Sequence, residues 1–180
     1  MAGGGLTSRP AIREGTGMSK VEFTDLKNYI FGSTAAIITD ISLIVGLGSA
    51  GTNKGPILGS LFTIALADNI SDSLSIHMYK EAEGVGMRLS WQATVLNFLA
   101  RVLVSLTFVA IVLVFSVAHA IPVAIVWGIL LVVLLSYWIT VSVKLEKRAL
   151  EIGKHLLVAL IMIVLSRYVG LLIAAHFPQE

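Results

Sequence analysis

The sequence predicts an all-α membrane protein with five transmembrane helices. Of its 180 residues, 56% are hydrophobic and only 13% are charged, against roughly 25% charged in soluble domains. Apolar stretches close to the ~20 residues that cross a bilayer recur five times along the chain. Basic residues gather in alternate loops between these stretches, as expected of a chain that crosses repeatedly. We therefore expect an integral, multi-pass membrane protein, placed in the cell inner membrane if the source is prokaryotic.

The elements follow one another without long linkers. Residues 1–18 are Gly-rich and contain no long apolar run, so we expect a flexible tail rather than a signal peptide. Residues 19–31 repeat apolar side chains at helical spacing, which predicts a short amphipathic helix at the membrane interface. Residues 19–180 then form a single domain whose five spans are 29–50, 57–79, 89–117, 121–143 and 155–177.

Loop composition predicts both the turns and the orientation. The breakers in GTNKGP join the first two spans, and AHAIP joins the third and fourth. With five spans, one face carries ten basic residues and the other carries only Lys54. The ten are Arg9, Arg13, Lys20, Lys27, Lys80, Arg88, Lys144, Lys147, Arg148 and Lys154. The excess of positive charge predicts a cytoplasmic N terminus.

Several function classes are disfavoured by composition. The chain has no cysteine, which excludes disulfides and thiolate metal sites. It shows no nucleophile–base pair and no zinc motif, so we do not expect an enzyme. The net charge is only +2, and the basic residues flank the spans instead of forming a patch of their own. We therefore expect no nucleic-acid partner, and lipid and ions remain as the expected partners.

Acidic residues inside the second span are the main functional signal. A carboxylate near the bilayer centre costs roughly 2.5 kcal/mol or more, so it persists where it is paired, wetted or used. Asp40 lies about 15 Å and Asp68 about 16 Å from the same face, and the short hairpin brings them together. Oxygen ligands of this kind suit hard or borderline divalent cations. The predicted metal-ligand set is Asp40, Asp68, Asn69, Asp72, Ser75 and Glu81.

Two arginines also lie within predicted spans. Arg101 and Arg167 each stand twelve residues into a span, near mid-depth, and each needs a charge partner. They could pair structurally with two of the three aspartates, or they could act as tethered competitors that hold the acids when no ion is bound. Of the three, we expect Asp72 to be the aspartate that lacks an arginine.

Three segments of the chain resemble the vacuolar iron transporter family. They are KNYIFGSTAAI, ALADNISDSLS and SRYVGLLIA, and the resemblance covers most of residues 27–175. It implies a five-span homodimer that exchanges Fe²⁺ or Mn²⁺ for protons along its first two spans, with no permanently bound cofactor. The chain departs from the family pattern at its metal site. Ala35 stands at the first-span aspartate, Asp72 at a methionine and Ile76 at a glutamate, and only residues 80–88 replace the long cytoplasmic insert.

These observations predict a transporter of a divalent metal ion, iron or manganese, that is coupled to protons if the resemblance holds. A second hypothesis is a non-transporting membrane subunit or scaffold that intramembrane Asp–Arg pairs hold together. A third is a pathway for another solute, in which the arginines meet an anionic group.

Overall fold

The computed structural model describes residues 17–142 and 148–177, and these residues form helices and short turns without any strand. The predicted tail therefore lies almost wholly outside the described residues. The elements are α1 (Gly17–Ser49), α2 (Lys54–Thr63), the π-helical η1 (Ile64–Asp68), α3 (Asn69–Ala82), α4 (Met87–Val114), α5 (Val117–Ser142) and α6 (Arg148–His176). This architecture confirms the all-α prediction.

Within residues 17–142 and 148–177, four helices are long and apolar enough to cross a membrane. Their apolar segments are Gly32–Ser49, Met87–Val114, Val117–Val141 and Arg148–His176. The second predicted span instead corresponds to α2, η1 and α3, which follow one another without a break. A fifth crossing and the cytoplasmic N terminus both stay predictions. The interface helix is not a separate element, because α1 runs continuously from Gly17.

The predicted turn between the third and fourth spans was wrong. The chain turns at residues 115–116, and α5 has already begun at Val117, so AHAIP is helical. The Ser116 carbonyl oxygen accepts backbone hydrogen bonds from His119 at 2.9 Å and Ala120 at 2.7 Å, and the Ser116 hydroxyl hydrogen-bonds His119 Nδ1 at 2.8 Å. Pro122 lies inside α5, so the helix lacks the backbone hydrogen bond that this position would donate to the Ala118 carbonyl oxygen.

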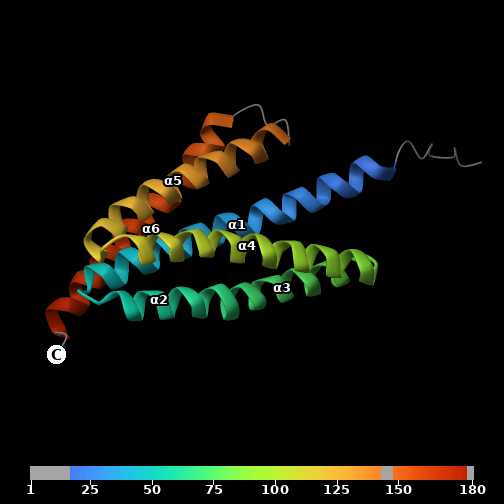
Figure 1. The fold of residues 1–180 in the computed structure, drawn as a ribbon. Helices are drawn as coiled ribbons and strands as arrows, with labels where there is room; N and C mark the ends of the chain where they lie inside the picture. The colour runs from blue at the N-terminus through green and yellow to red at the C-terminus, as the bar shows by residue number, and fades with distance from the viewer. Residues whose placement is uncertain (1–16, 143–147, 178–180) are drawn as a thin grey trace, which may run out of the picture.

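Helix α1 is the central element of the fold. It packs against α4, α5 and α6, while α3 packs mainly against α4. Figure 1 shows α1 between two arms, one made of α2, α3 and α4 and the other of α5 and α6. We call the end of the molecule at residues 50–53 the α1–α2 end, and the end at residues 83–86 the α3–α4 end. Toward the α1–α2 end, α1, α2, α4 and α5 share an apolar core that includes Ile44, Leu61, Phe108 and Val112.

Candidate functional site

A π-helical turn aligns the polar residues of the second predicted span. The buried positions are spaced four apart throughout: Ile57, Leu61, Ala65, Asn69, Ser73 and His77. In a regular α-helix, a four-residue spacing turns the stripe by about 40° at each step. The wider turn of η1 rotates it back. The stripe therefore keeps facing α4, apolar in α2 and polar in α3.

Helix α4 presents a matching polar stripe. Its buried polar residues recur at helical spacing and are Ser90, Thr94, Asn97, Arg101 and Ser105. Asn97 donates a hydrogen bond of 2.9 Å to the Ser73 hydroxyl. Arg101 Nε donates one of 2.7 Å to Asn69 Oδ1. We call these α3 and α4 residues, together with Asp40 of α1, the polar seam.

Arg101 is the charged centre of the polar seam. Its side chain is only 2% exposed, and its Nη2 lies 2.9 Å from Asp68 Oδ2, while Nη1 lies 2.8 Å from Asp72 Oδ2. Nη1 also donates to the Gly32 carbonyl oxygen of α1 at 3.2 Å. The expectation that Asp72 lacks an arginine was wrong. Asp68 and Asp72 stand one helical turn apart, so the two edges of one guanidinium reach both.

Asp40 is the aspartate that makes no ion pair with Arg101. It is 0% exposed, and the Ser105 hydroxyl of α4 is the side chain that faces its carboxylate as a hydrogen-bonding neighbour. Among the described residues, neither group has another hydrogen-bond partner. Arg101 and Asp68 both lie close enough to act on the carboxylate electrostatically. Buried polar groups with so few hydrogen-bond partners are uncommon, which makes Asp40 and Ser105 candidates for a functional role.

Arg167 lies away from the acids. It is exposed on α6, and the described residues include no acid that pairs with it. Helix α6 is shifted toward the α1–α2 end relative to α1, so Arg167 does not lie level with Asp40. A Cβ added at Gly170, one turn later, would lie 2.2 Å from the Gly46 carbonyl oxygen and 3.1 Å from the Ala50 nitrogen. Arg167 therefore stands beside the last turns of α1, beyond Asp40.

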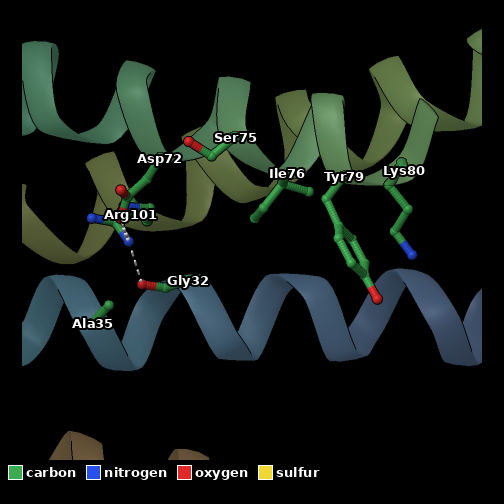
Figure 2. Close-up of a pocket in the computed structure, with 8 residues that line it drawn as sticks. All are labelled: Gly32, Ala35, Asp72, Ser75, Ile76, Tyr79, Lys80 and Arg101. Carbon is green, nitrogen blue, oxygen red and sulfur yellow. Dashed lines mark hydrogen bonds and ion pairs between the residues drawn. The ribbon is translucent and has the colours of Figure 1, made fainter. Parts of the chain in front are cut away.

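A cavity of about 460 Å³ opens beside the Arg101 cluster. Figure 2 shows Asp72, Ser75 and Tyr79 along one side, with Arg101 at its deep end. The lining residues are Gly32, Ala35, Asp72, Ser75, Ile76, Tyr79, Lys80 and Arg101. The side chains of Asp68 and Asp72 are 45% and 49% exposed, although the arginine between them is buried. The acid pair is thus accessible from outside the bundle.

The remaining predicted ligands differ in whether their oxygen atoms are free to bind a cation. Asn69 is buried, and its oxygen already accepts from Arg101. The Ser75 hydroxyl lines the cavity and donates to the Ser71 carbonyl oxygen at 3.0 Å, which leaves its lone pairs free for a cation. Glu81 is exposed at the α3–α4 end, 3.5 Å from His77 Nε2.

Sequence reasoning did not find most of the polar seam outside the aspartates, Asn69 and Arg101. Asn97 stands one turn before Arg101 on the same face, and it was missed together with Ser73, Ser90, Thr94 and Ser105. His77 is also buried, and its ring lies tilted against Trp91 at a centroid distance of 4.5 Å. The signal that could have found them is the four-residue recurrence of polar side chains in both helices.

The described residues contain no group of three or more His, Asp or Glu side chains arranged to hold a metal ion. No family model, curated protein or solved structure matches the chain. The vacuolar iron transporter resemblance, the homodimer and the choice of iron or manganese therefore stay predictions. Any account of function has to start from the acids, Arg101 and the cavity.

Proposed function

We propose that this protein moves a divalent cation across the membrane, with Asp68 and Asp72 as its first ligands. The observation that carries the proposal is a half-exposed acid pair held by a single buried arginine, with Asp72 and Arg101 lining a cavity. Arg101 stands inside the apolar segment Met87–Val114, where an ionisable group is costly, so packing alone gives little reason to keep it. An ion that enters the cavity would meet Asp72 first.

The charge balance of the cluster supports a divalent ion. Asp40, Asp68 and Asp72 carry three negative charges when ionised, and Arg101 carries one positive charge. The difference is two negative charges, which one divalent cation or two protons would neutralise. Exchange of one divalent cation for two protons would keep the cluster neutral in both states. Two carboxylates and the Ser75 hydroxyl, completed by water, form an oxygen-rich set that suits Mn²⁺, Fe²⁺, Mg²⁺ or Ca²⁺.

The test is uptake of these four ions by proteoliposomes that contain the purified protein. Asp72→Asn should abolish uptake, because the amide keeps the shape of the side chain and removes its charge. Glu151→Gln is the matched control, since this carboxylate lies on α6 and pairs with Lys154 at 2.7 Å, away from the cavity. Uptake by Asp72→Asn at the wild-type rate, in folded protein, would contradict the proposal.

One observation favours a second candidate, a non-transporting membrane subunit or scaffold. Arg101 joins α1, η1, α3 and α4 through Gly32, Asp68, Asn69 and Asp72, which is also what a structural staple does. Under this alternative, no divalent ion enters proteoliposomes. Arg101→Ala then releases a partner protein that copurifies in a fixed ratio with the wild type.

A further inference from the structure

The Arg101 cluster contains more acids than its arginine engages. Asp68 and Asp72 hold the guanidinium, while Asp40 interacts with its charge but makes no ion pair with it. Arg101 occupies Oδ2 of both acids, so a cation that binds Asp68 and Asp72 through both oxygens of each carboxylate has to compete with the guanidinium. The displaced guanidinium then stays buried, and a buried charge without a partner is strongly destabilising.

Asp40 and Ser105 offer the displaced guanidinium a second position. Ser105 follows Arg101 by four residues on the same face of α4, about 6 Å further along the helix axis. Asp40 faces Ser105 from α1, and apart from this neighbour neither the carboxylate nor the hydroxyl has a hydrogen-bond partner among the described residues. Arginine is long and flexible, and its fork of donors suits a carboxylate. Asp40 lies close enough to Arg101 for their charges to interact, so these acceptors are the nearest alternative that the structure offers to the guanidinium.

We propose that Arg101 is a movable counter-ion with two positions. Without the cation it holds Asp68 and Asp72, and with the cation bound it pairs with Asp40 and Ser105. This inference rests on the proposed function and adds to it a means of releasing the ion. When the guanidinium returns to Asp68 and Asp72, it replaces the cation as their partner. Asp40 thus acts on the cation through Arg101 and is not itself a ligand.

The test is a double-mutant cycle on Mn²⁺ affinity, measured by titration calorimetry on the full chain in detergent. Asp40→Asn should weaken Mn²⁺ binding about tenfold or more, within the 5–150-fold range of typical coupling. Arg101→Gln should strengthen binding, because it removes the competitor. In the Arg101→Gln background, Asp40→Asn should change little, since no guanidinium then needs a second position.

The outcomes separate this inference from the proposed function. If Asp40→Asn weakens binding equally in both backgrounds, Asp40 is a direct ligand and the movable counter-ion is wrong. If Asp40→Asn leaves the affinity of the otherwise wild-type protein unchanged, the second position does not exist. If the wild type binds none of Mn²⁺, Fe²⁺, Mg²⁺ and Ca²⁺, the proposed function itself fails, and this inference with it.

A second measurement needs no substitution at Arg101, in case that variant does not fold. Infrared difference spectra of protein with isotope-labelled arginine report changes around guanidinium groups. Mn²⁺ should shift a guanidinium band in the wild type, and the shift should be absent from Asp40→Asn, which isolates the response of Arg101 from that of the exposed arginines. An unshifted band in Mn²⁺-bound wild type would overturn the proposal.

Discussion

The same helices build two unlike regions. Toward the α1–α2 end, α1, α2 and α4 meet through the apolar core, with residues such as Ile44, Leu61 and Val112. Toward the α3–α4 end, α3 and α4 meet through the polar seam around Arg101. In a bilayer, apolar side chains gain little by leaving lipid, so the core acts through close packing. The seam places charges where they are costly, which points to a role beyond holding helices together.

The largest expected effect is the loss of stability when the positive charge of Arg101 is removed from the polar seam. Arg101→Met keeps much of the side-chain volume but leaves Asp68 and Asp72 without their cation, so it should lower the free energy of unfolding by about 3 kcal/mol, the low end for a broken buried pair because both acids are half-exposed. The measurement is unfolding in mixed micelles, followed by the fluorescence of the three tryptophans.

A compensated variant shows whether charge or packing is responsible. Arg101→Met combined with Asp68→Asn and Asp72→Asn removes the acids together with their arginine, and it should recover most of the lost stability. Recovery would mean that the seam is not kept for stability. If the triple variant is as unstable as Arg101→Met alone, the loss comes from packing, and the contrast with the apolar core disappears.

The sequence was enough to predict the long apolar helices but only part of the polar seam. Apolar runs located α4, α5 and α6, because the length of a span follows from bilayer thickness. The hairpin predicted that Asp40 and Asp68 approach each other, and Asp68 does act electrostatically on Asp40. It did not predict that Arg101 takes both Asp68 and Asp72. That outcome depends on the π turn of η1, which rotates α3 and leaves no clear mark in local composition.

The position of Arg167 illustrates a second limit. Counting residues from the end of a span assumes that all helices start at the same depth. The close contact of Gly170 with Gly46 shifts α6 relative to α1, and only the packed structure shows this shift. Charged residues in separate helices can therefore be assigned to similar depths from sequence, but not to each other.

A smaller effect is expected from added volume, and it should differ between the two regions. A Cβ at Gly32 would lie 1.8 Å from Asn97 Oδ1, and Asn97 is held by Ser73. Gly32→Ala should therefore cost about 1–3 kcal/mol. A Cβ at Gly128 would lie 2.0 Å from Ile41 Cδ1 and 2.5 Å from Ile41 Cγ1, in an apolar side chain that no hydrogen bond holds in place. Gly128→Ala should cost less, toward the lower end of that range.

Gly59 supplies the control for both substitutions, measured by the same unfolding experiment. A Cβ there meets nothing within 4 Å, and Gly59 lies inside α2. Gly59→Ala should stabilise the protein by about 0.5–1 kcal/mol, because alanine loses less conformational freedom in a helix than glycine does. Equal losses at Gly32 and Gly128 would mean that hydrogen bonding does not make the seam less adaptable than the core.

The smallest expected effects come from two serine substitutions in the polar seam, one at a structural hydroxyl and one at a hydroxyl proposed to affect Mn²⁺ binding. Ser73→Ala leaves the buried Asn97 amide without its acceptor and should cost about 1 kcal/mol in unfolding free energy. Ser105→Ala removes a buried hydroxyl whose hydrogen-bonding neighbour is Asp40, so stability should change by less than about 1 kcal/mol. Its Mn²⁺ affinity should nevertheless fall, because the second position of Arg101 loses an acceptor. A loss of stability with unchanged Mn²⁺ affinity in Ser105→Ala would instead make Ser105 a packing residue, and the seam would then end at Arg101.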